Sequence, residues 1–310
     1  MTKSTKDQKQ AVFYGLGAVL AWSTVATAFK LALRSLDHFQ LLFLANIFSL
    51  ISLGLVLMAG GKAPLLRTVT RRHVLRACGL GLLNPFLYYL VLFKAYALLP
   101  AQMAQPLNYT WALTLSLLSV PLLGHKLTWR DGVAGLVCYF GVVVISTGGD
   151  LKGLHVVSPL GVTLALGSTI IWALYWLGNT RFSQDENRVD PVVGLFLGFA
   201  FALPLVAVVV AIWSDFHFAD RGIWAGAYVG AIEMGFTFVL WLTAMRLTSA
   251  TARIANLIFL SPFLSLVFIH FVLGEHIVPG TLVGLVFIVA GLAFQTAGKA
   301  KNSAVGYRRS

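Results

Sequence analysis

Apolar stretches long enough to cross a lipid bilayer follow one another along almost the whole chain, and this pattern limits the fold more than any other feature. A spanning helix needs roughly 20 predominantly apolar residues. Lipid offers no partner for backbone N–H and C=O groups, so each stretch must satisfy its backbone internally, as a helix does. We therefore predict an all-α integral membrane protein with ten transmembrane helices, at about residues 11–33, 38–60, 74–98, 102–123, 132–149, 158–180, 191–213, 222–245, 251–273 and 280–298.

The balance of apolar and charged residues excludes a soluble protein of this length. Of the 310 residues, 58% are hydrophobic and only 11% are charged, whereas soluble domains are about a quarter charged. The net charge of +12 would indicate nucleic-acid binding in a soluble protein. In a membrane protein it is explained by the enrichment of Lys and Arg in cytoplasmic loops. Membrane lipid is therefore an expected partner, and nucleic acid is not.

The distribution of basic residues predicts the orientation of the chain. With the N-terminus inside the cell, eighteen Lys and Arg residues fall on the cytoplasmic side and five on the opposite side. Short cytoplasmic loops carry such an excess of positive charge. Both termini are therefore predicted to be cytoplasmic, with residues 1–10 and 299–310 as tails.

Prolines fall into two positional groups. At a helix start proline is tolerated, because its missing N–H would have no intrahelical partner there. Inside a span it should kink or locally open the helix. The first group is Pro100, Pro159, Pro191 and Pro279, and the second is Pro85, Pro106, Pro204 and Pro262.

The two halves of the sequence are related. Sliding the sequence along itself by 150 positions aligns Trp22 with Trp172, near the same place in the first helix of each half. The halves, residues 11–150 and 151–298, then hold five helices each, and because five is odd the second half enters the membrane from the opposite side. Inverted repeats are typical of secondary transporters, which open a site between the repeats to either side in turn. Duplication for stability alone and a channel remain alternatives.

Aromatic and amide side chains within the spans indicate where a pathway would run, because lipid-facing positions should be plainly apolar. In the sixth span Trp172, Tyr175 and Trp176 share one helix face. This face either lines a pocket, packs on a neighbouring helix or forms an interfacial belt. Amides and further aromatics in the third and fourth spans should face protein or water, because lipid would penalise them. They are Asn84, Tyr88, Gln105, Asn108, Tyr109 and Trp111.

Glu233 lies in the middle of the eighth span, within the segment GAYVGAIEMGFTFVLW. An ionised carboxylate at the bilayer centre costs several kcal/mol unless it is paired or hydrated. Its helix face, which includes Trp241, can point into a cavity between the repeats. Three interpretations stay open: an anchor for a substrate ammonium, a proton-carrying site, or a hydrogen-bonded structural residue. GxxxG spacings, which allow close helix packing, occur at Gly226/Gly230 and Gly280/Gly284.

The sequence contains no recognisable catalytic or metal-binding motif. No HExxH, GxSxG, P-loop or dinucleotide-binding pattern occurs. Cys78 and Cys138 lie in separate apolar stretches without metal-ligand spacing, so we interpret them as packing residues. We therefore expect no enzyme activity, no cofactor and no metal.

Several motifs resemble a known family. The ten spans in two halves, the segment AWS (Ala21, Trp22, Ser23) and the segment LGE (Leu273, Gly274, Glu275) resemble the drug/metabolite transporter superfamily, EamA type. Within it, LNYTWALTLSLL (107–118) and IIWALYWLGNTRF (170–182) resemble the aromatic amino acid exporter subgroup. His125 departs from the family pattern, which often has an acidic residue at this position. The resemblance implies roles for Trp22, Ser23, Asn108, Tyr109, Trp111, Trp172 and Tyr175.

Together, these features predict a bacterial inner-membrane secondary transporter that exports amino acids, aromatic ones above all, and related small metabolites by alternating access. Transport is either down-gradient or coupled to an ion such as the proton. The alternatives are a nucleotide-sugar or metabolite exchanger of the same superfamily, and a membrane-embedded enzyme or enzyme subunit acting on a lipid or small metabolite.

Overall fold

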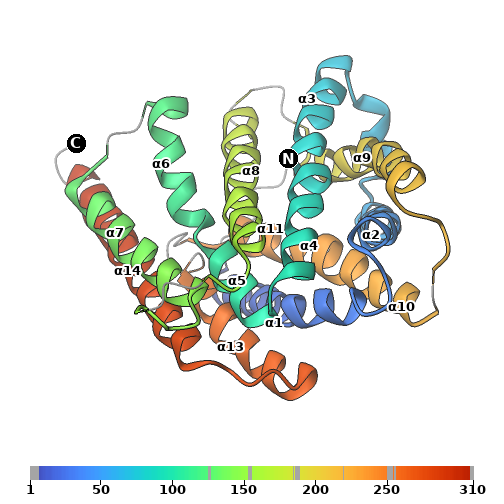
Figure 1. Ribbon diagram of the computed structural model, residues 1–310. Helices are drawn as coiled ribbons and strands as arrows, with labels where there is room; N and C mark the ends of the chain where they lie inside the picture. The colour runs from blue at the N-terminus through green and yellow to red at the C-terminus, as the bar shows by residue number, and fades with distance from the viewer. Residues whose placement is uncertain are drawn as a thin grey trace.

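The computed structural model describes residues 7–124, 127–152, 156–183, 185, 189–218, 220–249, 254 and 256–307. Within these residues the protein is a bundle of helices without strands (Figure 1). The first half contains α1 (Gln8–Ala32), α2 (His38–Ala59), η1 (Ala63–Thr68), α3 (Arg71–Gly81), η2 (Leu82–Leu87), α4 (Tyr88–Leu98), α5 (Ala101–Tyr109), α6 (Trp111–Leu123) and α7 (Trp129–Ser146). The second contains α8 (Pro159–Ser183), α9 (Pro191–Trp213), α10 (Asp220–Tyr228), η3 (Val229–Phe236), α11 (Thr237–Leu247), η4 (Asn256–Leu260), α13 (Ser261–Phe268), η5 (Ile269–Leu273) and α14 (Pro279–Tyr307).

The predicted spans correspond closely to these helices. In the described part of the chain, nine helical stretches are long and apolar enough to cross a membrane. The remaining predicted span, the fourth, at residues 102–123, is divided at Thr110 into α5, with 9 residues, and α6, with 13 residues. The all-α membrane fold is therefore confirmed, and the fourth span is a broken helix rather than a continuous one.

The third and fourth helices of each half are irregular at equivalent places. The third is π-helical at η2 in the first half and at η3 in the second. The fourth changes direction at Thr110 in the first half, and in the second it begins as the 3₁₀ segment η4 before α13. Broken helices near the midplane are where transporters of this architecture place their binding sites.

The prolines account for part of this irregularity. Pro85 lies in η2 beside Asn84, whose backbone is non-helical (φ −143°, ψ 117°). Pro262 stands at the start of α13, directly after η4. Pro204, in contrast, lies within α9 without interrupting it, so the predicted opening is absent there; local adjustments can satisfy the carbonyl that a proline leaves free. As predicted, α8, α9 and α14 begin with proline.

Contacts between the halves are reciprocal, as expected of two units related by a two-fold axis. The first helix of each half packs on the third helix of the other, in the pairs α1–α11 and α8–α4. The second helices pack together as α2–α9, and the fifth helices as α7–α14. The two-repeat architecture expected from the sequence is therefore the observed one, with the midplane segments η2 and η3 at its centre.

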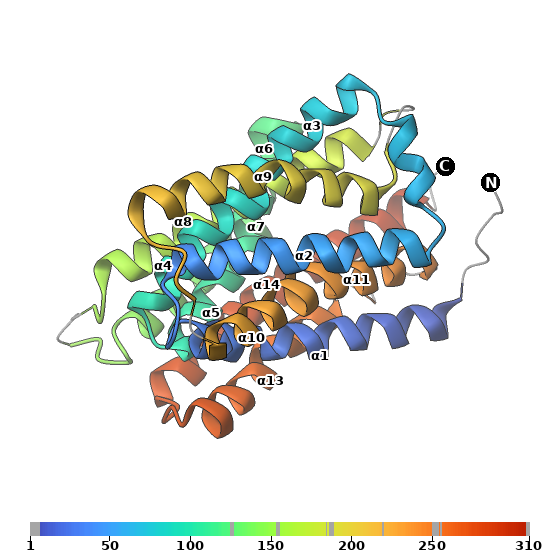
Figure 2. The same ribbon diagram turned by 90° about the vertical axis from the view of Figure 1, so that its right-hand side faces the viewer.

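Both ends of the described chain lie at the same end of the bundle. Figure 2 shows the start of α1 and the last turns of α14 together on its right-hand side. The Asp7 N–H donates to the Leu247 carbonyl (3.0 Å), which places the end of α11 there too. We call this the terminal end, and the opposite end, where α1 finishes and α2 begins, the far end. A chain that crosses a membrane an even number of times has both of its ends on the same side.

Candidate functional site

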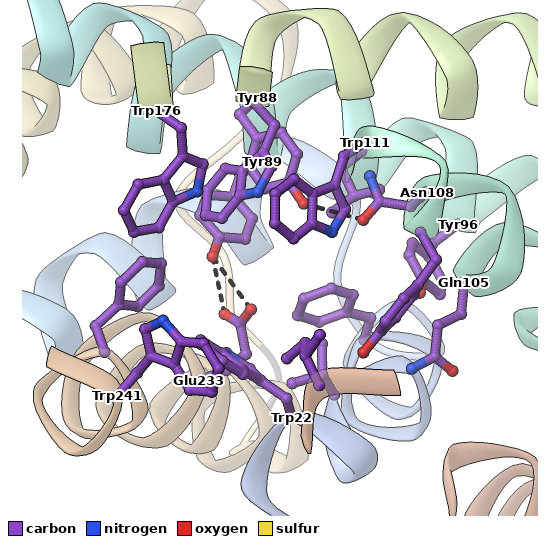
Figure 3. Close-up of a pocket in the computed structure, with 17 residues that line it drawn as sticks. Trp22, Tyr88, Tyr89, Tyr96, Gln105, Asn108, Trp111, Trp176, Glu233 and Trp241 are labelled. Atoms are coloured by element: carbon purple, nitrogen blue, oxygen red, sulfur yellow. Dashed lines mark hydrogen bonds between the residues drawn. The ribbon is translucent and has the colours of Figure 1, made fainter. Parts of the chain in front are cut away.

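Helices of both repeats surround a cavity of about 170 Å³ near the middle of the bundle (Figure 3). Its walls come from α1, α4, α5, α6, α8, η3, α11 and η4. Most of the lining is aromatic. The lining residues are Trp22, Val25, Phe29, Tyr88, Tyr89, Leu92, Tyr96, Gln105, Asn108, Tyr109, Trp111, Trp172, Trp176, Glu233, Phe238, Trp241 and Ile258.

The structure brings most of the predicted binding residues together in this lining. Those that line the cavity are Trp22, Tyr88, Gln105, Asn108, Tyr109, Trp111, Trp172, Trp176, Glu233 and Trp241. Ser23, Asn84 and Tyr175 do not. All three are buried, and the Ser23 hydroxyl donates to the carbonyl of Val19 in its own helix (2.6 Å). A short hydroxyl bonded to its own backbone has little reach into a cavity.

Trp172 is the centre of the aromatic lining. Its ring stacks on Tyr88 with centroids 4.4 Å apart, and it meets Trp111 edge-on at 6.5 Å. Tyr175 stacks against it at 5.6 Å without reaching the cavity. The aromatic face of the sixth span therefore combines two of its predicted roles, since Trp172 and Trp176 line the cavity while Tyr175 packs behind Trp172.

A second aromatic pair in the lining joins α1 to α11. Trp22 of α1 and Trp241 of α11 have centroids 5.3 Å apart. Trp22 also meets Phe238 edge-on at 5.9 Å. These rings come from opposite repeats, so the cavity wall itself is part of the interface between the repeats.

Polar atoms in the lining are of two kinds. Asn108 is held in place, because its amide donates to the Ser168 hydroxyl (2.9 Å) and its carbonyl accepts from the Tyr88 hydroxyl (3.2 Å). The indole N–H of Trp176 and the side-chain oxygen of Gln105 are buried without a hydrogen-bond partner among the described residues. Buried polar groups are rarely left unpaired, so these two atoms are available to a bound solute.

Glu233 points into the cavity from the π-helical segment η3 (Figure 3). Its two carboxylate oxygens accept from the Tyr89 hydroxyl at 3.2 and 3.0 Å. The residue is only 7% exposed, and no ion pair between described residues includes it. The carboxylate thus meets one hydroxyl donor and a wall of aromatic rings.

Several lining residues were not predicted: Val25, Phe29, Tyr89, Leu92, Tyr96, Phe238 and Ile258. Aliphatic and phenylalanine side chains carry no signal in a membrane helix, because they are equally suited to lipid. The two tyrosines, Tyr89 and Tyr96, are different, since their i, i+7 spacing places them on one helix face, with Leu92 between them at i+3. That spacing would have identified the inward face of α4.

Burial of the lining changes along the cavity. Trp22, which precedes Phe29 by seven residues in α1, is partly exposed, as are Trp176 and Trp241, which lie towards the terminal end of their spans. Phe29 and Tyr96, towards the far end, are 1% and 2% exposed. The cavity is therefore sealed by side chains at its far end and less completely covered at its terminal end.

The GxxxG glycines lie at close contacts between the repeats. A Cβ at Gly226 would stand 2.8 Å from the Cβ of Leu44, and one at Gly230 would overlap the carbonyl of Ala45. Gly280 faces the backbone of Gly148 and Gly149. Gly284 faces the carbonyl oxygen of Gly141. These glycines allow α2 to approach the α10–η3 helix, and α7 to approach α14.

Comparison with known proteins gives a consistent family. The EamA-like transporter family matches the chain twice, over residues 9–147 and 159–296. The protein named Uncharacterized transporter YvbV from Bacillus subtilis (strain 168) is 27% identical over 234 residues, 72% of each chain. An uncharacterized transporter from Clostridium kluyveri is 27% identical over 174 residues, 55% of each chain. A protein crystal structure superposes with a TM-score of 0.65 at 22% identity, over 94% of this chain and 98% of the other, which shows a shared fold.

Proposed function

The chain belongs to the EamA-like transporter family, and from that premise we propose that it exports amino acids and related small metabolites, aromatic ones above all, across the bacterial inner membrane. Both curated relatives are named as transporters. The observation that carries it is the aromatic cavity with a single carboxylate between the two repeats.

The position of the cavity supports alternating access. Inverted-repeat transporters keep their site near the midplane, between the repeats, and expose it to either side by moving one repeat against the other. Trp22 and Trp241 come from different repeats and contact each other in the wall of this cavity. Relative movement of the repeats would therefore change the shape of the site itself. The close contacts at Gly230 and Gly284 would let the helices slide past each other during this movement.

The lining supports a substrate with an aromatic ring. Ring pairs add about 0.5–1.5 kcal/mol beyond the area that they bury, and Trp172, Trp111 and Tyr88 already form such a cluster. A substrate ring could stack on the faces that point into the cavity. The unpaired indole N–H of Trp176 could then donate to a polar group of the substrate.

Of the three interpretations of Glu233, the geometry favours the ammonium anchor. An ionised carboxylate offers about four acceptor positions, and the described structure supplies one donor, Tyr89. A substrate ammonium would fill the remaining positions, and the surrounding rings would add cation–π attraction. A purely structural glutamate would be expected to have its acceptors filled by the protein. A proton-carrying role is the competing outcome of the test below.

The same lining argues against a phosphate-ester substrate. A nucleotide-sugar exchanger would need several Lys or Arg side chains at the site, because phosphate oxygens are bound by cationic donors. Among the described residues that line the cavity there is no Lys, Arg or His. The membrane-enzyme alternative is distinguished by experiment, because product formation without net solute movement would identify it.

The test is a flux screen in proteoliposomes. Purified protein is reconstituted with each of the twenty amino acids and with aromatic amines inside, and efflux is followed with and without a pH gradient. We expect the fastest efflux for aromatic amino acids. Absence of protein-dependent flux for every compound, from protein that is monodisperse and folded, would overturn the proposal. Flux that requires the pH gradient would show proton coupling.

A further inference from the structure

A set of contacts centred on Glu275, which does not line the cavity, joins the two repeats at the far end. Glu275 lies in the loop between η5 and α14 of the second repeat. Its carboxylate accepts from the backbone N–H groups of Ala101 (3.0 Å) and Gln102 (3.3 Å), the first two residues of α5 in the first repeat. The first N–H groups of a helix lack intrahelical partners, and a negative charge is favourable beside them.

Gln102 connects the same two segments a second time. Its amide nitrogen donates to the His276 carbonyl (2.9 Å) and to the Glu275 carboxylate (3.4 Å). Its amide oxygen accepts from the Val278 N–H (2.8 Å) and the Thr281 hydroxyl (3.2 Å). The residue is 5% exposed. The start of α5 is therefore bonded along the whole loop that leads into α14 of the other repeat.

Lys30 provides the complementary charge at the adjacent helix end. From α1, its ammonium donates to the carbonyls of Tyr96 (2.9 Å) and Leu99 (3.0 Å), at the C-terminal end of α4. Cations are favourable at this end of a helix. Tyr96 lines the cavity, as does Phe29, which precedes Lys30. The α4–α5 connection is thus held between a cation and an anion, directly beyond the sealed end of the cavity.

The equivalent positions of the other repeat do not carry these charges. At the offset of 150 residues, Thr180 corresponds to Lys30 and His125 corresponds to Glu275. The alignment is supported by Gly124 and Gly274, which end helices with the same left-handed backbone (φ 71° and 72°). His125 lies outside the described residues, so for that position the comparison is one of sequence.

The difference matters because the two repeats exchange roles. In an inverted-repeat transporter, the change from a closed far end to a closed terminal end requires each repeat to adopt the conformation of the other. The contacts at the far end involve Lys30 and Glu275, whereas the aligned positions in the sequence of the other repeat hold a threonine, Thr180, and a histidine, His125. The contacts beside α2 and α9 do not create this difference. Lys62–Asp190 is formed at the terminal end and Gln40–Asp215 at the far end, and both are present in the same structure.

We propose that Glu275, with Gln102 and Lys30, is a positioning residue of a far-end gate, and that this gate holds the empty transporter open towards the terminal end. The inference rests on the alternating-access mechanism proposed above. It predicts that the two conformations are unequally populated without substrate. Removing the charge of Glu275 or of Lys30 shifts the population towards the state that is open at the far end.

The test measures access to the cavity rather than transport. Cys78 and Cys138 are replaced by alanine and a reporter cysteine is introduced by Leu92→Cys, at a lining position between Tyr89 and Tyr96. A membrane-impermeant maleimide is then applied from either side of the membrane in cells and inverted vesicles. We expect slow labelling from the far-end side in the parent protein. Labelling from that side should rise about threefold or more in Glu275→Gln and Lys30→Met, in keeping with the size of charge effects at helix ends.

Two controls keep the result interpretable. Asp190→Asn removes another carboxylate that caps a helix and pairs across the repeats, but at the terminal end, and it should leave far-end labelling unchanged. Glu275→Asp, which retains the charge, should restore much of the parent behaviour and shows that the loop still folds. Unchanged far-end labelling in both Glu275→Gln and Lys30→Met, or fast far-end labelling of the parent protein, would overturn the gate. Either result leaves the flux screen intact as a separate test of the substrate class.

Discussion

At the scale of single residues, Glu233 has an unusual environment for a carboxylate. It is a buried carboxylate at the centre of a membrane bundle, it accepts from one tyrosine hydroxyl, and it faces aromatic rings. Leaving such a group without a counter-charge is costly in lipid. The cost is reduced when a positively charged substrate occupies the cavity, and this gives the residue a direct means of selecting what binds.

Glu233→Gln tests that role. The amide keeps the shape and the hydrogen bond to Tyr89 but cannot carry a negative charge, so we expect the protein to fold normally and efflux of ammonium-bearing substrates to fall about tenfold, equivalent to a loss of about 1.4 kcal/mol. The measurement is the efflux rate in proteoliposomes as a function of pH. A Glu233→Gln variant with the parent rate and the parent pH profile would show that the residue is structural. A change confined to the pH profile would identify the proton-carrying role.

Trp172→Ala tests the aromatic lining. The ring stacks on Tyr88 and contacts Trp111, so its removal should raise the apparent KM for aromatic substrates by roughly three- to tenfold, the range expected for lost ring pairs. Small aliphatic substrates should be affected less. Trp213→Ala, at a position that is 63% exposed, is the matched control. Equal losses for both substrate classes would indicate that Trp172 serves packing alone.

At the scale of helices, the elements that form the site are the irregular ones. Glu233 is presented by the π-helical segment η3, and Asn108 and Trp111 stand on either side of the break at Thr110. A π-helical turn inserts an extra residue into the helix and redirects the side chains that follow. The long regular helices α2 and α9 contribute no residue to the lining, and they pack against each other instead.

The close packing of η3 against α2 depends on Gly230, and the variant Gly230→Ala tests this dependence. The new Cβ would overlap the Ala45 carbonyl, so α2 and η3 would have to separate, and overpacking of this kind costs typically 1–3 kcal/mol. We expect a clearly lower unfolding temperature in detergent. Gly167→Ala in α8 is the control, because a Cβ there meets no atom within 4 Å and alanine favours a helix. Equal stability of the two variants would contradict the packing argument.

At the scale of the whole molecule, the fold places two five-helix units around one cavity and brings both ends of the described chain to one end of the bundle. Which side of the membrane that end faces follows from the basic residues and stays a prediction. Epitope tags at the two termini, probed in intact and permeabilised cells, test it. We expect both tags to be reached only after permeabilisation. Tags on different faces of the membrane would contradict the paired inverted repeats.

The membrane spans, the internal repeat and the family could be predicted from the sequence, because the signals that indicate them lie within single segments of the chain. A bilayer rewards any run of about 20 apolar residues, so helices such as 38–59 and 191–213 are visible locally, without knowledge of their neighbours. Polar and aromatic residues within the spans, such as Asn108, Trp172 and Glu233, also indicate the inward faces by themselves. These residues all line the cavity in the folded protein.

Only the tertiary structure decided which apolar and aromatic residues complete that lining, because Phe29 or Phe238 is equally suited to lipid and to a cavity wall, and the choice depends on the helix opposite. It also decided that Ser23 and Tyr175 are buried outside the lining, that the fourth span breaks at Thr110, and that Glu275 reaches the start of α5. Each of these depends on groups far apart in the chain that meet only after the two repeats have packed. Local hydrophobicity is a property of a segment, whereas a cavity and its gate are properties of the interface between segments.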